Sequence, residues 1–239
     1  MPSIRIGTSG WTYSHWKGPF YPSDCPKNRW LEYYSRHFDT VELNATFYRQ
    51  PKPITFTNWK KRTPDLFLWS VKASRYITHV KRLKDAGDSL ERFYESALLL
   101  GSKLGPILIQ LPPGLKYDQD LVEEFMAGLN PSLRHVMEVR NASWMNDTFF
   151  QQLESHGVAF CISDTAGRYP YKETVTADFV YVRLHGSRKL YASEYTEEEL
   201  AGWAEKIGRF KADVFLYFDN DFKGYAVANA RRLKQMLGL

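Results

Sequence analysis

Short runs of β-type hydrophobic residues recur along the chain, and segments with helical periodicity separate most of them. The runs that we interpret as strands are residues 4–9, 40–47, 66–73, 106–111, 135–141, 158–164, 179–186 and 214–220. Strands that alternate with helices are typical of a parallel sheet, and about eight such units are typical of a (β/α)8 barrel. The chain has 239 residues, close to the roughly 250 of such barrels. We therefore predict an α/β fold, a single TIM-like (β/α)8 barrel domain with parallel strands over residues 1–239.

Apolar side chains recur every three to four residues between the strands, which predicts amphipathic helices packed against the barrel. Helices are expected at residues 30–38, 90–98, 121–129, 148–155, 200–207 and 225–237. Asp147 is the predicted N-cap of the helix at 148–155, and Thr196 with Glu199 is predicted to form a capping box before the next one. The first loop, residues 10–28, is long and contains several prolines. Long loops of compact domains tend to be functional.

Polar side chains are concentrated at the C-terminal ends of the predicted strands, whereas the N-terminal halves are mostly Val, Leu, Ile, Phe and Tyr. In the run 135–141, alternation puts Val136, Glu138 and Arg140 on one face, which therefore changes from apolar to charged. Active sites of (β/α)8 barrels lie at the C-terminal face. The strand-end residues that we expect at this face are Glu42, Asn44, Lys72, Gln110, Glu138, Arg140, Asp164, Arg183, His185, Asp219 and Asn220.

The charged strand ends indicate acid and base chemistry beside an anion site. The predicted catalytic residues are Glu42, Glu138, Asp164 and His185. Burial and neighbouring charge can set which of them holds a proton. The cations Lys72, Arg140 and Arg183 are predicted to bind a phosphate or carboxylate group, and Asn44, Gln110, Asp219 and Asn220 to bind other parts of the substrate. The alternative is a structural ion network that only fills the barrel top, since buried charges must be paired in any case.

Aromatic residues in the loops above the strands could stack on a planar ring of a ligand. Of these, Trp11, Tyr48 and Trp144 belong to the predicted substrate-binding set. Basic loops with glycine follow the seventh and eighth strands, at residues 185–189 and 222–224, where such barrels often bind phosphate. The alternatives are that the rings pack the loops together and that the basic loops are solvated surface.

A resident metal is not predicted. Zinc would call for several histidines, but only His185 stands at a strand end and His135 begins a strand. Glu42, Glu138, Asp164 and Asp219 could hold magnesium or manganese through oxygen ligands, an alternative that the nearby cations disfavour because they would repel the ion. Gly-x-Gly-x-x-Gly and Gly-x-Ser-x-Gly patterns are absent from the sequence, so neither a dinucleotide cofactor nor a hydrolase elbow is expected.

The formal net charge is +5 at pH 7 without a long run of like charge, so the composition favours anionic partners only mildly. Cys25 and Cys161 suggest neither a disulfide framework nor a metal motif. The N-terminus leads directly into a strand, and no apolar run approaches about 18 residues. We therefore expect a cytoplasmic protein without membrane contact, whose partner is an anionic small molecule or a nucleic acid.

Several longer motifs occur in order along the chain. They are Ile-Gly-Thr-Ser-Gly-Trp at 6–11, Thr-Val-Glu-Leu-Asn-Ala-Thr-Phe-Tyr at 40–48, Gln-Leu-Pro-Pro at 110–113, Glu-Val-Arg-Asn-Ala-Ser-Trp at 138–144, Val-Arg-Leu-His-Gly at 182–186 and Tyr-Phe-Asp-Asn-Asp at 217–221. With these motifs the chain resembles the YecE-like family, domain of unknown function 72, over essentially its whole length. The resemblance implies a TIM-like barrel with these polar residues at its top, and no settled reaction.

The sequence thus predicts an enzyme, a hydrolase or lyase, that uses acid-base chemistry on a phosphorylated or other anionic ring-bearing substrate. One alternative is a nucleic-acid-binding or metal-dependent phosphodiester-cleaving barrel, which the family's likeness to barrels that cut damaged DNA suggests by analogy. A non-catalytic binding protein is the other.

Overall fold

The computed structural model describes residues 2–239, so Met1, the first residue of the predicted domain, lies outside the described residues. Its strands are β1 (Ile4–Thr8), β2 (Thr40–Leu43), β3 (Leu68–Lys72), β4 (Leu104–Gln110), β5 (His135–Glu138), β6 (Ala159–Asp164), β7 (Phe179–Leu184) and β8 (Asp213–Phe218). They pair in the order β1-β8-β7-β6-β5-β4-β3-β2, and every pairing is parallel. The edge strands β1 and β2 meet through an isolated bridge between Ser9 and Glu42. This nearly closed (β/α)8 barrel confirms the predicted fold.

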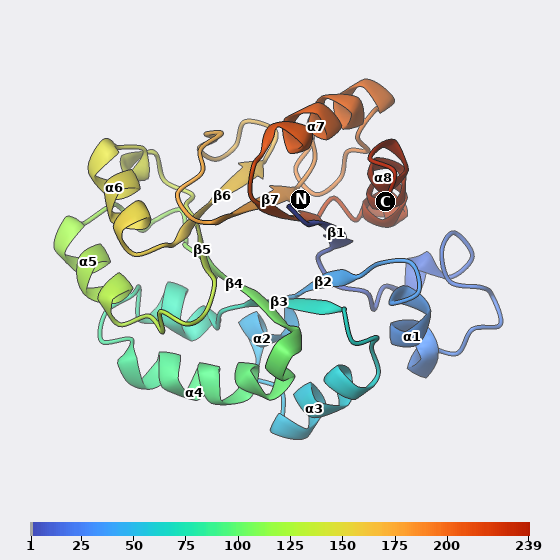
Figure 1. Ribbon diagram of the computed structural model, residues 1–239, viewed down its shortest axis with the longest axis horizontal. Coiled ribbons are helices and arrows are strands. Elements are labelled where there is room, and N and C mark those ends of the chain that lie inside the picture. Colours follow the sequence, from blue (N-terminus) through green and yellow to red (C-terminus); the bar gives the residue numbers. More distant parts are fainter. Residues whose placement is uncertain (1) are drawn as a thin grey trace.

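Helices surround the strands, with α7 and α8 above them, α5 and α6 at the left, and α3 and α4 below in Figure 1. The α-helices are α1 (Trp30–Tyr34), α2 (Ala45–Tyr48), α3 (Pro53–Lys61), α4 (Gly87–Ala97), α5 (Gln119–Ala127), α6 (Asp147–Ser155), α7 (Glu197–Arg209) and α8 (Tyr225–Met236). Short 3-10 or π segments lie at Ser14–Trp16, Lys27–Arg29, Tyr76–Val80, Leu98–Lys103, Ala142–Trp144 and Phe222–Gly224. Apolar residues of the helices and of the outer strand faces form one large buried cluster. The predicted layer of helices outside the sheet is therefore present.

Side chains inside the barrel change from apolar to charged along the strands. Phe179 of β7 lies edge-on to Phe215 of β8, with ring centroids 6.0 Å apart. Two residues further along each strand, Tyr181 and Tyr217 pair at 5.2 Å, and Arg183 continues the row on β7. Because alternate residues of a strand share a face, this order brings the charges to the C-terminal end of the barrel.

The seam between β1 and β2 is joined by a side chain from α1. The backbone N–H of Thr8 donates to the Tyr34 hydroxyl, and this hydroxyl donates to the Thr40 carbonyl, each at 3.1 Å. One phenol thus links backbone groups that a regular strand pair would join directly. Gly7 permits the close approach, because a Cβ atom there would lie 2.4 Å from the Thr40 oxygen.

The second strand is shorter than predicted. It ends at Leu43 and not at residue 47, because Asn44 already has helical backbone angles and the next residues form α2. The Thr46 hydroxyl donates to the Lys72 carbonyl at 2.6 Å and fixes this turn against β3. Asn44 and Tyr48 therefore project from a helical turn and its cap, so strand alternation does not set their direction.

Of the two predicted helix caps, one is confirmed and one is wrong by a single residue. Thr196 and Glu199 form the predicted capping box at the start of α7. The N-cap of α6, however, is Asn146 and not Asp147, since the Asn146 side chain accepts from the backbone N–H of Phe149 at 2.9 Å. Asn and Asp are about equally good caps, so the sequence alone did not separate these neighbours.

Candidate active site at the C-terminal face

Arg183, near the end of β7, holds together the charged cluster inside the barrel. Its Nε and Nη2 donate to the two carboxylate oxygens of Glu42 at 2.9 and 2.7 Å, a bidentate pair. Its Nη1 donates to Glu138 at 2.6 Å, and Nη2 also reaches Asp219 at 3.1 Å. Arg183 and both glutamates are at most 1% exposed. These predicted site residues therefore meet in one buried network.

The Glu42 carboxylate is fully engaged. In addition to the two bonds from Arg183, it accepts from Ser9 Oγ and from the Tyr181 hydroxyl, each at 2.7 Å. A carboxylate has about four acceptor positions, so Glu42 has none left for a substrate. This geometry favours an anchoring role over the predicted catalytic one.

Glu138, at the end of β5, is also surrounded by donors. Gln110 Nε2 and Arg140 Nε both donate to its Oε1 at 2.9 Å, and Arg183 occupies the other oxygen. Burial by itself would raise the pKa of Glu138, but the charges of Arg183 and Arg140 hold it well below its ordinary value. Glu138 therefore stays ionised at neutral pH and is poorly suited to act as a general acid.

His185 and Asp219 come together at the mouth of the barrel, where Nδ1 of the histidine lies 3.0 Å from Asp219 Oδ2. Arg183 Nη1 lies 3.2 Å from His185 Nε2. A guanidinium only donates, so Nε2 is the acceptor of this contact, while Nδ1 is buried and makes no hydrogen bond within residues 2–239. Burial would raise the pKa of Asp219, but Arg183 and His185 lower it. Asp219 Oδ1 makes no hydrogen bond within residues 2–239, and 21% of the side chain is exposed, so an ionised acceptor faces the mouth.

Lys72, at the end of β3, is a buried cation without a polar partner. It is 8% exposed, and its Nζ makes no hydrogen bond or ion pair with any described residue. The ammonium lies 4.2 Å from the centroid of the Phe47 ring. Burial and the charge of Arg183 lower the pKa of Lys72 to about 8, although Glu138 and Glu42 act in the opposite direction.

We expect Lys72→Met to stabilise the protein at neutral pH by at most about 3 kcal/mol, because the native environment disfavours the charged amine. The native pKa of about 8 lies below the ordinary 10.5, so the unfolded chain binds more protons between these values. Wild-type stability should therefore rise with pH across that window, and the advantage of the variant should shrink. Urea unfolding at a series of pH values measures both effects.

Lys103 provides the matched control for this measurement. It is 5% exposed, but its Nζ donates to the carbonyls of Lys60 and Thr63 at 2.8 and 2.6 Å. Lys103→Met should leave these carbonyls without a donor and destabilise the protein at neutral pH by about 1 to 3 kcal/mol. Our account of Lys72 is incorrect if Lys72→Met is the less stable of the two variants at pH 7.

Arg140 closes the cluster on the side of β5. Its Nη2 donates to the Tyr191 hydroxyl at 3.3 Å, and its guanidinium lies 4.7 Å from the centroid of the Tyr169 ring. Nη1 has no hydrogen-bond partner within residues 2–239. Tyr191 has a backbone φ of 62°, which is rare for a residue with a large side chain, and its ring lies edge-on to His185. A strained tyrosine thus covers the cluster and leaves one end of Arg140 unpaired.

Asp164 and Asn220 brace the loop that follows β7. Asp164 accepts from the Tyr195 hydroxyl at 2.9 Å, and that hydroxyl accepts from the backbone N–H of Gly186 at 3.0 Å. Burial raises the pKa of Asp164 despite the bond from Tyr195. Asn220 Nδ2 donates to the Ser193 carbonyl at 2.9 Å. The contacts of both residues therefore support a structural role at the rim of the site.

The backbone amides of the predicted anion-binding loop are already used. Those of Arg188 and Lys189 both donate to Ser193 Oγ at 3.1 Å. Gly186 allows this fold, because its φ is 117° and a Cβ there would lie 2.5 Å from the Lys189 oxygen. The loop therefore offers a ligand its side chains and not these two amides.

Trp144 does not reach the site, contrary to its predicted role in stacking on a ligand. It is fully buried, its Nε1 donates to the Leu115 carbonyl at 2.7 Å, and its ring packs against Phe149 at 5.0 Å. The 3-10 turn Ala142–Trp144 directs the indole inward beneath the loop after β4. For this residue the alternative of loop packing is the correct one.

Trp11, Asn44 and Tyr48 line a cavity of about 510 Å³ beside the first loop. Tyr48 is 80% exposed, and the side-chain oxygen of Asn44 is buried without a hydrogen-bond partner among residues 2–239. Ser9 also lines this cavity, and its hydroxyl donates to Glu42. The cavity therefore adjoins the charged cluster.

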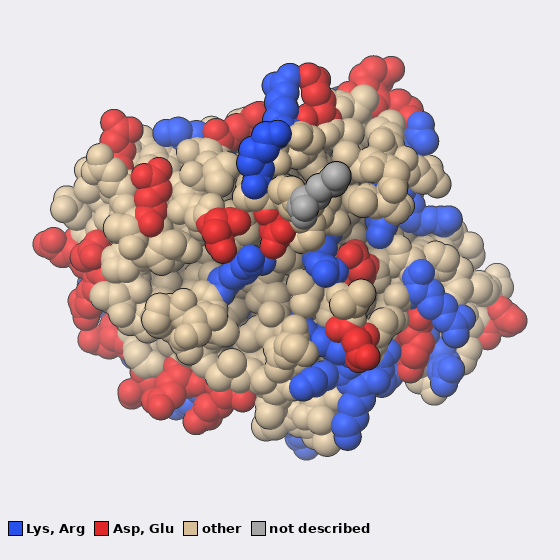
Figure 2. Space-filling model, viewed as in Figure 1, with Lys and Arg blue, Asp and Glu red and all other residues tan. Residues whose placement is uncertain are grey.

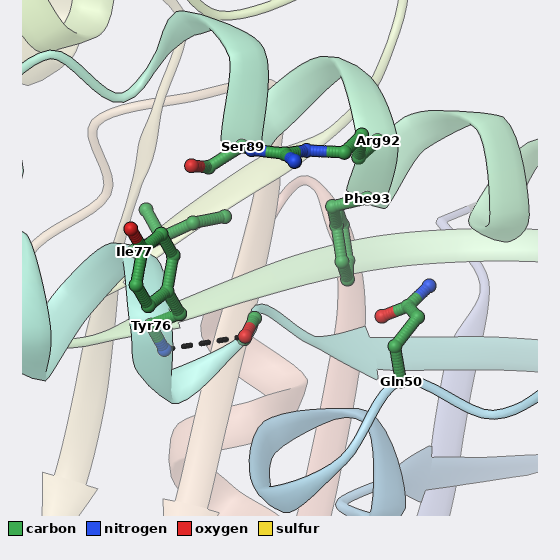
Figure 3. A pocket seen from close by; sticks show the side chains of 7 residues that line it. Gln50, Tyr76, Ile77, Ser89, Arg92 and Phe93 are labelled. Atoms are coloured by element: carbon green, nitrogen blue, oxygen red, sulfur yellow. Dashed lines mark hydrogen bonds between the residues drawn. The ribbon is translucent and has the colours of Figure 1, made fainter.

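A smaller cavity of about 320 Å³ lies between α4 and the segment after β3 (Figure 3). Tyr76, Arg92 and Phe93 line it, and the backbone N–H of Tyr76 donates to Ser74 Oγ at 3.2 Å. Its lining contains no residue of the charged cluster. We therefore do not consider it the active site.

Within the described part of the chain, His, Cys, Asp and Glu side chains form no group of three or more that could hold a metal ion. The carboxylates of the cluster instead face guanidinium groups. No helix within residues 2–239 is long and apolar enough to cross a membrane.

Sequence reasoning missed Ser9 and Tyr181, and it placed Tyr191 only among the loop aromatics that could stack on a ligand. Tyr181 precedes Arg183 by two residues, so strand alternation would have put both on the inner face. Ser9 follows β1 and could have been found as the polar end of that strand. Tyr191 lies in an irregular loop, and no signal in the sequence indicates that it turns back over His185.

Comparisons with known proteins agree with this architecture. A family model described as "Protein of unknown function DUF72" matches residues 5–239. The UPF0759 protein YunF of Bacillus subtilis (strain 168) is 27% identical over 275 residues, which cover 99% of this chain and 95% of that protein. The UPF0759 protein YecE of Escherichia coli (strain K12) is 27% identical over 168 residues, 68% of this chain and 59% of that protein. The crystal structure of a DUF72 family protein from Thermotoga maritima has a TM-score of 0.87 at 32% identity, covering 99% of this chain and all of that one.

The family model spans nearly the whole chain, and the Thermotoga structure shares its complete barrel. The resemblance found in the sequence motifs is therefore confirmed. The chain belongs to the DUF72 family of proteins of unknown function.

Proposed function

We propose that this protein is an enzyme that transfers a proton on an anionic, ring-bearing substrate held at the C-terminal face of the barrel. The observation that carries the proposal is that the cluster has more hydrogen-bond donors than free acceptors. Its formal charges nevertheless balance, with Lys72, Arg140 and Arg183 opposite Glu42, Glu138 and Asp219. Lys72 Nζ and Arg140 Nη1 lack partners among residues 2–239, whereas both oxygens of Glu42 and of Glu138 are occupied. A phosphate or carboxylate group at the mouth of the barrel would pair both of these cationic donors.

Asp219 is the group that we propose to exchange a proton with the substrate. Its Oδ1 is free, its pKa is low, and it therefore acts first as a base. His185 is fully buried with its Nδ1 3.0 Å from the other oxygen, and it acts as a positioning residue. This assignment keeps His185 in the predicted chemistry and transfers the proton step from Glu42 and Glu138 to Asp219.

The cavity beside the first loop is suited to the ring of the substrate. Trp11 and Tyr48 supply aromatic surface, and the unpaired oxygen of Asn44 would accept from an N–H or O–H group on the ring. Because Ser9 connects this cavity to Glu42, a ring bound there would lie next to the charged cluster.

The nucleic-acid alternative has less support from the surface charge. Figure 2 shows acidic side chains along α4, α5 and α6 and basic ones near α3, so this face carries both signs. Binding to a phosphate backbone usually relies on a basic patch or stripe.

The proposed anion site can be tested by thermal shift. We expect a phosphorylated ring compound, such as a nucleoside monophosphate or pyridoxal 5′-phosphate, to raise the melting temperature. Ligand at 100 times its dissociation constant stabilises the native state by about 2.7 kcal/mol. Arg140→Ala should weaken the binding by at least about tenfold, because a hydrogen bond to a charged group contributes about 1.5 to 3 kcal/mol.

Arg168→Ala is the matched control, because Arg168 also faces the Tyr169 ring but lies outside the cluster. It should leave the shift unchanged. Single-stranded DNA is included in the same screen at low and high salt. A shift produced only by DNA and abolished by salt would refute the small-molecule proposal, as would a phosphate-induced shift that persists in Arg140→Ala.

A further inference from the structure

We propose that Lys72 attacks the carbonyl group of an aldehyde or ketone and forms a covalent imine with it. The inference deepens the proposed function and rests on it, because we take the carbonyl group to be part of the same anionic substrate. It changes the role of Lys72 from a cation that binds an anion to an amine that reacts.

The position of Lys72 is the first argument. Its side chain extends from the C-terminal end of β3 into the same mouth as Asp219, and the charged groups that act on it are Arg183, Glu138, Glu42 and Asp219. It is more than nine-tenths buried, yet its Nζ donates to no atom of residues 2–239. An amine nitrogen that is not held in hydrogen bonds can approach a carbonyl carbon, whereas one held by acceptors must first break those bonds.

Lys103 shows what a structural buried lysine looks like in the same protein. Its Nζ contacts two backbone carbonyls and lies 3.7 Å from Asp65. All of these partners stabilise the ammonium form. The ammonium of Lys72 lies over the face of the Phe47 ring and has no hydrogen-bond acceptor among residues 2–239, although Arg183 and the carboxylates of Glu138, Glu42 and Asp219 act on it from a distance. The two buried lysines therefore differ in hydrogen bonding, because only the nitrogen of Lys103 is held by acceptors.

The titration of Lys72 agrees with this geometry. Burial and Arg183 lower the pKa of Lys72 to about 8. At pH 7 about a tenth of such a side chain is free amine, about 300 times more than for a lysine with the ordinary value. Lysine nucleophiles in enzymes are activated in this way, by desolvation and by a neighbouring cation.

The reaction needs no oxidant or reductant. The nitrogen lone pair forms a bond to the carbonyl carbon while the carbon–oxygen π pair moves to oxygen, which takes up a proton as the nitrogen loses one. The resulting carbinolamine loses its hydroxyl group as water when the nitrogen lone pair forms the carbon–nitrogen double bond and the last nitrogen proton leaves. Amine and carbonyl thus give imine and water. Asp219 Oδ1 is an available acceptor for the proton that leaves nitrogen.

The test is reductive trapping on the full-length protein. Pyridoxal 5′-phosphate, an anionic ring-bearing aldehyde, and glycolaldehyde, an uncharged one, are each added with sodium borohydride. Borohydride delivers hydride to the imine carbon, a proton from water completes the secondary amine, and peptide mass spectrometry locates it. We expect Lys72 to be labelled at pH 7 at least about tenfold faster than exposed lysines such as Lys61. Its labelling rate should be half-maximal near pH 8.

Two variants and one internal control make the result specific. Lys72→Arg keeps the positive charge but removes the amine, so the fast phase of labelling should disappear. Lys72→Met should do the same, and its melting temperature verifies that the chain is folded. Lys103 should stay unlabelled in the native protein, because burial alone does not make a lysine reactive when its nitrogen is bonded.

The two aldehydes separate this inference from the proposed function. In one outcome, glycolaldehyde labels Lys72 before the exposed lysines, pyridoxal 5′-phosphate labels it no faster than glycolaldehyde does, and Arg140→Ala changes neither rate. The imine inference then holds and the anion site is refuted. If phosphorylated ligands stabilise the wild type but not Arg140→Ala, and neither aldehyde labels Lys72 ahead of the exposed lysines, the imine inference is overturned and the proposed function stands.

Discussion

Arg183→Met should lower the free energy of unfolding by about 5 kcal/mol at pH 7, the largest effect that we expect from a single substitution in this protein. Arg183 is the partner of both buried glutamates, and methionine fills similar space without a charge. In the variant, Glu42 and Glu138 would stay buried, each at most 1% exposed, but would lose the guanidinium group that pairs with both. Urea unfolding followed by circular dichroism measures the change.

The pH dependence of the two proteins should have opposite sign. In the wild type the pKa of Glu138 lies well below its ordinary value. Ionised Glu138 therefore stabilises the folded protein fully at any pH above that ordinary value, and this stabilisation is lost as the pH falls from there towards the native pKa. Without Arg183, burial should raise the native pKa of Glu138 above the unfolded value. The variant should therefore gain stability as the pH falls from 7 towards 5, while the wild type does not.

Adding Glu42→Gln and Glu138→Gln to Arg183→Met should restore part of the lost stability, because replacing a whole buried ion network costs less than breaking it. Arg209→Met is the control, since its exposed pair with Glu205 should contribute less than about 1 kcal/mol. If Arg183→Met were as stable as Arg209→Met, the cluster would not anchor the barrel.

Gly7→Ala should destabilise the barrel by more than about 3 kcal/mol, although it adds a single methyl group. The new Cβ would lie 2.4 Å from the Thr40 oxygen, a backbone atom that cannot rotate away. β1 and β2 would have to separate, and the Tyr34 hydroxyl could then no longer bridge Thr8 and Thr40. Hydrogen exchange of the Thr8 amide together with urea unfolding would report the opened seam.

Gly202→Ala is the control for this substitution. Gly202 lies within α7, and a Cβ there would meet no atom within 4 Å. Alanine should stabilise this helix by about 0.5 to 1 kcal/mol relative to glycine. Equal effects of Gly7→Ala and Gly202→Ala would mean that the β1–β2 seam is not sterically tight.

The cluster has a lower part whose carboxylates are saturated with hydrogen bonds and an upper part with unpaired polar atoms. Glu42 and Glu138 have their oxygens occupied and hold Arg183 in position. Lys72, Arg140 and Asp219 each keep an atom without a partner among residues 2–239, and these atoms are the ones on which the proposed chemistry depends. The interpretation as a purely structural ion network therefore describes the lower part well, but leaves the upper part unexplained.

The sequence alone determined the parallel barrel and the end at which the charged residues meet. Strands alternate with amphipathic helices, which dictates the layers, and strand alternation places Tyr181 and Arg183 on the same inner face. Local signals also determined the capping box of Thr196 and Glu199, because its partners are three residues apart in the chain. All of these features depend on spacing within a short segment.

Only the tertiary structure decided what each charged residue can do. Whether an oxygen of Glu42 is free depends on Ser9, which follows β1, and on Tyr181 and Arg183 of β7, all far from Glu42 in the sequence. Trp144 resembles a loop aromatic in the sequence, yet it is buried, with its N–H bonded to the Leu115 carbonyl. Lys72 is distinguished from Lys103 only by its lack of partners. The hydrogen bonds and the burial of a polar group depend on all the residues that surround it in space. The sequence gives residue types and their spacing, but not which distant residues become neighbours.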